Sequence, residues 1–164
     1  MTRYVPDAVL QRALSFGENE LAPAGPLSLR GLAELYLLYC DRVAQHGVQS
    51  DTANRLFWTW ECLQPLTGQD PELAWRVICH CLELLTTVEQ AGQLAAGPLE
   101  DLIAFHGETV IARIEAIAHG SARFRFVLNG VWSQGNEDTN VWQRVTRARR
   151  AGPLMTDPHG LPSA

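Results

Sequence analysis

One stretch, PELAWRVICHCLELL at residues 71–85, constrains the fold most, because it is apolar on almost every side. At roughly 100° per residue, Arg76, His80 and Glu83 share one narrow polar strip, and apolar side chains occupy almost everything else. A helix with so little polar surface has to be packed on most sides. The stretch therefore predicts a central helix.

The rest of the chain repeats the helical pattern. Apolar residues recur at intervals of three and four, and almost no stretch alternates for long enough to predict a strand. Four residues of typical capping types precede such stretches, namely Ser28, Ser50, Asp70 and Ser121. We expect Pro65 to end the helix announced by Ser50, whose buried face holds Leu56, Phe57, Trp60 and Leu63. The prediction is an all-α protein, either a compact multi-helix bundle or a small irregular helical solenoid of about seven to eight helices.

Composition and linkers suggest how the chain is divided. Hydrophobic residues make up 46% and charged residues 19% of the sequence, which is typical of a soluble globular protein. We expect an N-terminal helical segment at residues 1–68 and a helical domain at residues 69–150, packed on that segment as one globule. The Pro- and Gly-rich residues 151–164 are expected to form a flexible tail.

The charged residues exclude several kinds of chemistry. All 13 basic residues are arginines, so a phosphate-binding P-loop of the usual kind and a Schiff-base lysine are excluded. Residues 1–110 carry six arginines against 14 acidic residues, whereas residues 111–164 carry seven against four. An acidic body disfavours nonspecific nucleic-acid binding and favours a basic partner protein. Arg144, Arg147, Arg149 and Arg150 could touch phosphate, but no nucleic-acid motif accompanies them.

Targeting signals and membrane spans are not predicted. The N-terminus lacks the basic start and apolar stretch of a secretory signal, and no segment approaches 18 uninterrupted apolar residues. We therefore expect a cytoplasmic protein with no membrane contact. In that compartment the four cysteines, Cys40, Cys62, Cys79 and Cys81, are expected to be reduced and to pack as small hydrophobic residues.

The stretch AAGPLEDLIAFHG, residues 95–107, raises the question of an active site. Glu100, Asp101 and His106 could serve acid–base chemistry or, with a cysteine, bind a metal. The structural interpretation is simpler: Pro98 opens a helix, both carboxylates lie in its favourable first turn, and His106 with Gly107 ends it. Cys79, His80 and Cys81 point about 100° apart on one helix and cannot converge on one ion, so we expect no metal and no cofactor.

Trp58 is the candidate for a partner-binding surface. It points away from the buried face of its helix and shares its side with Arg55, which is the composition of an interface hot spot. Alternatively, a second helix layer or the N-terminal segment covers it. Together with Glu61, these residues form the first predicted contact surface, and the polar strip of Arg76, His80 and Glu83 forms the second.

Residues 70 to about 147 resemble a known family. The runs DPELAW, AAGPLEDLIAFHG, RIEAIA, RFRFVLNGVW and VWQRV resemble a bacterial family of small helical domains of unknown function, whose members share a GPLEDLL-x-x-HG signature and a terminal GVW. The resemblance implies a compact helical domain in a bacterial cytoplasm, and it supplies no reaction or cofactor. Residues 1–65 lie outside it.

The leading functional hypothesis is a non-enzymatic helical protein that binds another protein. Small size, an acidic body and the absence of catalytic motifs favour an immunity or antitoxin-like inhibitor of a toxin as the more specific hypothesis. The alternative is a small metal-dependent enzyme or sensor that uses Glu100, Asp101 and His106. The sequence does not specify the partner or the oligomeric state.

Overall fold

The computed structural model describes residues 3–163, and these residues form helices and connecting loops. Their only extended pairing is a single antiparallel bridge between Tyr4 and Ser28, so the described part of the chain contains no strand. The all-α prediction is confirmed. The helices belong to two compact units, called here the N-terminal unit and the C-terminal unit, which divide between Leu84 and Leu85.

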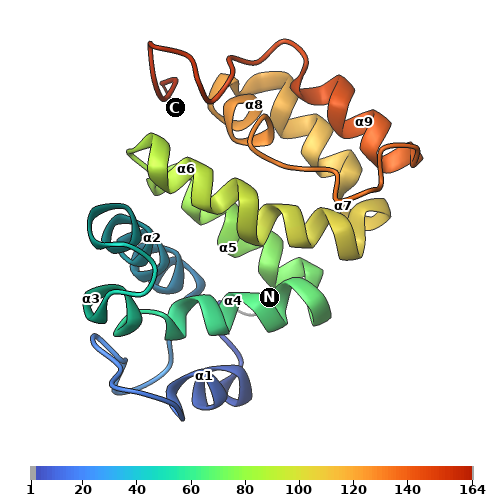
Figure 1. Cartoon of the computed structure of the whole chain (residues 1–164). Helices are drawn as coiled ribbons and strands as arrows, with labels where there is room; N and C mark the ends of the chain where they lie inside the picture. Colours follow the sequence, from blue (N-terminus) through green and yellow to red (C-terminus); the bar gives the residue numbers. More distant parts are fainter. Residues whose placement is uncertain (1–2, 164) are drawn as a thin grey trace. The chain divides into compact units, whose positions relative to one another are not determined.

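The N-terminal unit is built around its last helix. In chain order its helices are α1 (Asp7–Leu14), α2 (Leu29–His46), α3 (Asp51–Asn54), α4 (Trp58–Gln69) and α5 (Pro71–Leu84). α5 packs against both α2 and α4, and α1 packs on α4 (Figure 1). Six side chains of α5 are buried, namely Leu73, Ala74, Trp75, Val77, Ile78 and Cys81. The apolar helix is therefore central within this unit, as its composition predicts.

Capping residues set the beginnings of the helices as the sequence predicts. Each of four side chains accepts a hydrogen bond from the backbone amide three residues further on: Ser28 at 2.9 Å, Ser50 at 3.2 Å, Asp70 at 3.0 Å and, in the C-terminal unit, Ser121 at 3.0 Å. α2 ends at His46 and is followed by Gly47, whose φ of 88° is in the region that favours glycine. Local chemistry alone thus fixes these helix ends.

The prediction that Pro65 ends a helix is wrong. α4 continues through Pro65 to Gln69, and the helix expected from Ser50 is instead interrupted between α3 and α4. The helix beyond the proline buries Leu66 and Thr67, and this burial offsets the hydrogen bond that a proline cannot donate. The interruption also changes the helical phase, so Phe57, expected in the buried face, is 36% exposed.

The C-terminal unit contains the remaining helices. They are α6 (Val88–Leu94), the π-helical turn η1 (Ala95–Leu99), α7 (Glu100–Gly120), α8 (Ala122–Leu128) and α9 (Asn140–Arg149). α7 is the longest and packs against both α8 and α9 (Figure 1). A bidentate ion pair joins α9 to α7, with Arg144 Nε and Nη2 at 2.9 and 2.6 Å from the carboxylate of Glu115.

Two bends interrupt the run from α6 to α7. At Gly97 the backbone has φ −123° and ψ −105°, and at His106 it has φ −134° and ψ 26°. The sequence predicted a helix end at His106 and Gly107. The structure shows a kink there instead, and α7 continues to Gly120 because Val110, Ile111 and Ile114 beyond it are buried. The kink redirects the first half of α7, which forms one wall of the pocket described below.

Loops and the C-terminal segment complete this unit. The Arg123 guanidinium donates to the carbonyl oxygens of Leu85 and Pro162, both at 3.1 Å, and the Asn129 amide donates to that of Pro153 at 3.0 Å. Residues 150–163 contain no helix, and the flexibility expected of them stays a prediction, as does the proposed division at residue 68. Among the described residues, no helix combines the length and apolar character needed to cross a membrane.

Candidate functional site

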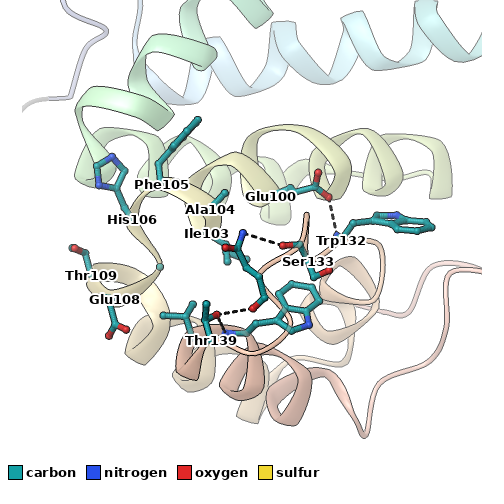
Figure 2. A pocket seen from close by; sticks show the side chains of 14 residues that line it. Glu100, Ile103, Ala104, Phe105, His106, Glu108, Thr109, Trp132, Ser133 and Thr139 are labelled. Atoms are coloured by element: carbon teal, nitrogen blue, oxygen red, sulfur yellow. Dashed lines mark hydrogen bonds between the residues drawn. The ribbon is translucent and has the colours of Figure 1, made fainter.

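A pocket of about 320 Å³ opens in the C-terminal unit between the first half of α7 and the segment that leads into α9 (Figure 2). Its wall on α7 is formed by Glu100, Ile103, Ala104, Phe105, His106, Gly107, Glu108 and Thr109. Its opposite wall is formed by Trp132, Ser133, Asn136, Thr139, Val141 and Trp142. The pocket therefore lies where the kinked helix and a polar loop face each other.

Two exposed aromatic side chains lie at this pocket. Trp132 is 76% exposed, more than any other large apolar side chain among residues 3–163, and Phe105 is 60% exposed. Figure 2 shows them on opposite walls, with Phe105 on α7 and Trp132 on the facing loop. Exposed aromatic residues at a concave surface are typical of binding sites, because their burial against a partner releases much apolar surface from water.

Glu100 fixes the position of Trp132. Its side chain is only 8% exposed; one carboxylate oxygen accepts a hydrogen bond from Trp132 N at 2.8 Å and the other accepts from the side-chain amide of Gln134. No described arginine or histidine forms an ion pair with it. The neighbouring Asp101 has its pKa raised, first by burial and then by the charge of Glu100. The pocket thus holds a buried carboxylate with neutral partners only.

Close packing at Gly107 brings α9 to the pocket. A Cβ atom at this position would lie 2.5 Å from Cγ1 of Val141, which is well inside van der Waals contact. Gly107 directly follows the kink at His106, and it is buried. Glycine is therefore required here so that the start of α9 can approach α7 and close the floor of the pocket.

The loop before α9 is ordered by its own hydrogen bonds. Asn136 Nδ2 donates to the carbonyl oxygen of Ser133 at 3.1 Å, and Thr139 Oγ1 donates to that of Asn136 at 2.8 Å. Thr139 also caps α9 by accepting from Trp142 N at 3.2 Å. Figure 2 shows these bonds along one wall of the pocket. The wall is therefore formed before any ligand arrives.

Two of the four C-terminal arginines proposed as phosphate contacts have structural partners. Arg144 pairs with Glu115, and the Arg149 guanidinium lies 4.9 Å from the ring centre of Trp142 and donates to the carbonyl oxygen of Val131 at 3.0 Å. Burial lowers the pKa of Arg149. Two of the four arginines proposed as phosphate contacts are thus engaged within the unit, which weakens that hypothesis.

In the N-terminal unit, the structure corrects the prediction that Trp58 is a surface contact. Trp58 is 1% exposed, and its Nε1 donates to the carbonyl oxygen of Glu20 at 3.0 Å. The alternative that the N-terminal segment covers it is confirmed. That segment is held by Arg42, which donates two 2.8 Å hydrogen bonds to the Glu20 carboxylate and thereby lowers its pKa.

The other two residues of the first predicted surface lie near this cover. Arg55 is exposed, and its guanidinium lies 3.8 Å from the carboxylate of Glu18. Glu61 is half-buried on α4, and burial raises its pKa. With Trp58 buried, the surface loses the aromatic anchor that made it a hot-spot candidate, and its role in binding stays a prediction.

The second predicted surface packs partly against α2. Arg30 of α2 lies 3.3 Å from the Glu83 carboxylate, and His80 Nδ1 lies 3.5 Å from the same group. Glu83 is exposed, whereas Arg76 and His80 are half-buried. The structure therefore brings His80 and Glu83 together with Arg30, and partner binding by this strip stays a prediction.

Of the residues in the enzyme or metal alternative, Glu100 and His106 line the pocket, whereas Asp101 does not. Within residues 3–163, no three side chains of the metal-binding types come together as a ligand group. All four cysteines belong to the N-terminal unit. Burial raises the pKa of Cys40 and of Cys62 to about 12, so these two thiols are poor nucleophiles at neutral pH.

Sequence reasoning missed Trp132 and Phe105 as the exposed aromatic pair. Trp132 lies between Val131 and the polar loop SQGNEDTN, outside any helical stripe that could bury it, and this position was an available signal. Phe105 has no such signal, because its exposure depends on the kink at the following residue.

The described residues thus form an all-α protein with an open, aromatic and acidic pocket in its C-terminal unit. The chain belongs to a family of unknown function, DUF6869, whose family model matches residues 46–152. The match begins earlier than the resemblance suggested, at the end of α2, and it includes every residue that lines the pocket. No curated protein and no solved structure matches the chain.

Proposed function

We propose that the protein binds another protein and that the pocket of the C-terminal unit is the docking surface. The observation that supports the proposal is the 76% exposure of Trp132 beside a pocket whose walls are already ordered. Burying an exposed tryptophan at a preformed surface gives affinity without a large ordering cost. The more specific form of the proposal is a non-enzymatic inhibitor of immunity or antitoxin type, in which the partner is a toxin.

The finer parts of the resemblance belong to the same proposal. We propose that GPLEDLIAFHG at residues 97–107 is the signature of the family, because Glu100 and Gly107 within it shape the pocket. A bacterial, cytoplasmic setting accompanies this proposal. Binding of nucleic acid is disfavoured because the pocket lining includes two glutamates and no arginine.

The test is a comparison of three forms of the full chain: wild type, Trp132→Ala and Phe16→Ala. Phe16 is the matched control, since it is an aromatic residue of 68% exposure that belongs to the N-terminal unit. Each tagged form is incubated with extract of the source cells, the recovered proteins are identified, and the partner is then purified for titration calorimetry. We expect Trp132→Ala to weaken binding at least about 30-fold, equivalent to about 2 kcal/mol, with Phe16→Ala unchanged.

Equal affinity of Trp132→Ala and wild type for the purified partner would refute the docking surface. The inhibitor form needs one further measurement, in which the isolated partner's activity is followed while the wild-type protein is added. Suppression at one equivalent supports inhibition, and full activity at saturation refutes it.

A second candidate, the metal-dependent enzyme or sensor, is favoured by one observation: Glu100 and His106 line the same pocket. Elemental analysis of the purified protein tests it. Stoichiometric zinc or iron that is lost in a Glu100→Gln variant supports this candidate, and a metal-free, partner-binding protein refutes it.

A further inference from the structure

The pocket has a negatively charged lining. Its ionisable lining residues are Glu100, Glu108 and His106, and no arginine lines it. Glu100 forms no ion pair with a described residue, and Glu108 forms none within 4 Å, although its charge helps to raise the pKa of Arg144. Glu137 and Asp138 on the adjoining loop are exposed and add negative charge. An incoming cation would therefore be attracted to this pocket.

Glu100 gives this charge unusual weight. The residue is 8% exposed, and its carboxylate is bonded to the Trp132 backbone amide and the Gln134 side chain, both of which are neutral. A buried carboxylate without a cationic partner is costly, and a cation that arrives from outside gains more from it than from an exposed carboxylate. The residue that binds the backbone amide of Trp132 therefore also supplies negative charge beside it.

The pocket is also small and lined with aromatic and oxygen-bearing groups. At about 320 Å³ it is near the lower end of the range for ligand pockets, which suits one side chain better than a whole small molecule. A flat guanidinium stacks on indole rings and donates in several directions at once, whereas an ammonium is a compact, strongly hydrated point charge. The pocket lining includes two tryptophans and the oxygen-bearing side chains of Ser133, Asn136 and Glu108.

We propose that the pocket receives an arginine side chain of the partner protein, attracted by the carboxylates of Glu100 and Glu108, while apolar groups of the partner cover the exposed Trp132 ring. This inference rests on the proposed function and adds the chemistry that the partner must present. The partner segment carries an arginine next to apolar residues, and those residues cover the exposed indole and Phe105.

The test uses the full chain labelled with ¹⁵N and three blocked tripeptides, in which alanines flank arginine, citrulline or lysine. Citrulline has nearly the shape of arginine and no charge, so this comparison needs no mutation of the protein. The readouts are the backbone and indole N–H resonances of Trp132 and the side-chain amide of Gln134. We expect saturable shifts with the arginine peptide at concentrations of about 1–10 mM, and binding at least about tenfold weaker for the citrulline and lysine peptides.

Variants of the protein locate the charge. Glu108→Gln is expected to weaken binding of the arginine peptide at least about threefold. Glu89 is an exposed glutamate on α6 outside the pocket lining, and Glu89→Gln is expected to leave that binding unchanged. Glu100→Gln is expected to weaken it by about tenfold or more, with folding verified by the chemical-shift dispersion of the spectrum. Weaker binding in both pocket variants and unchanged binding in Glu89→Gln place the cation at this site.

Equal shifts with arginine and citrulline, or no Trp132 shift at about 20 mM arginine peptide, overturn the inference. Equal affinity for lysine overturns the choice of arginine. These outcomes are independent of the test of the proposed function. If Trp132→Ala loses the protein partner while the peptides do not discriminate, the docking surface stands and the arginine inference fails. If the peptides discriminate but the partner binds Trp132→Ala normally, the pocket prefers arginine and the proposed function fails.

Discussion

Replacing Gly107 by alanine tests the close packing that forms the pocket. The new Cβ would lie 2.5 Å from Val141 Cγ1 and 3.3 Å from Cγ2, whereas carbon atoms in contact are about 3.5–4.0 Å apart. α9 would therefore have to withdraw by about 1 Å. Overpacking of this kind costs about 1–3 kcal/mol. Alanine also has a higher helix propensity than glycine, which offsets up to about 1 kcal/mol of this loss in unfolding free energy.

Gly92→Ala provides the matched control. Gly92 belongs to α6 of the same unit, and a Cβ there meets nothing within 4 Å. It therefore gains the propensity of alanine without the clash, so the difference in unfolding free energy between the two variants isolates the overpacking, about 1–3 kcal/mol. Urea unfolding followed by circular dichroism measures that difference.

A double-mutant cycle identifies the clashing partner. In a Val141→Ala background the two methyl groups that face Gly107 are removed, so Gly107→Ala should become about as favourable as Gly92→Ala. If Gly107→Ala is as stable as Gly92→Ala in the wild-type background, the close approach of α9 to α7 is not required and the reasoning fails. If Gly107→Ala remains less stable than Gly92→Ala in the Val141→Ala background, another contact causes the loss of stability.

Two further predictions concern the N-terminal unit. Trp58→Ala should lower the free energy of unfolding by about 3–5 kcal/mol, because the ring is buried and its Nε1 donates to the carbonyl oxygen of Glu20. Partner binding by the folded variant should be unchanged, and weaker binding by folded protein would contradict the core role of Trp58. Cys40 and Cys62 should resist iodoacetamide at pH 8, as followed by mass spectrometry, since their pKa is raised to about 12. Because the pKa values of these thiols are raised in the folded state, the unfolded chain loses its thiol protons first as the pH rises above the ordinary thiol range. The free energy of unfolding should therefore fall as the pH rises toward 12, and the urea midpoint should fall with it. A midpoint that stays constant over that interval would contradict this.

The sequence predicts features that depend on neighbouring residues and misses those that depend on distant ones. Ser28 and Ser121 begin helices because a hydroxyl three residues before an amide caps it in any context. Pro65 has the local chemistry of a helix end, but burial beyond it decides the outcome. Likewise the burial of Trp58 depends on Glu20, which is 38 residues away.

The pocket was partly visible in the sequence. The stretch AAGPLEDLIAFHG raises the question of an active site, with Glu100, Asp101 and His106 as candidates, and Glu100 and His106 line the pocket. The sequence does not predict the opposite wall of the pocket. Glu100 contacts Trp132 and Gly107 lies against Val141, each more than thirty residues further along the chain. A glycine and a carboxylate on one helix do not specify which loop they will hold.

Arg123 has a consequence for local opening of the C-terminal unit. Its guanidinium bonds the carbonyl oxygen of Leu85, at the start of the unit, and that of Pro162, near its end. The two ends of the unit are therefore hydrogen-bonded to the same guanidinium. A fluctuation that breaks the bond to one end also weakens the bond to the other. We expect amides near Leu85 and along residues 150–163 to lose their protection from hydrogen exchange together, so that these two distant stretches open as one cooperative unit.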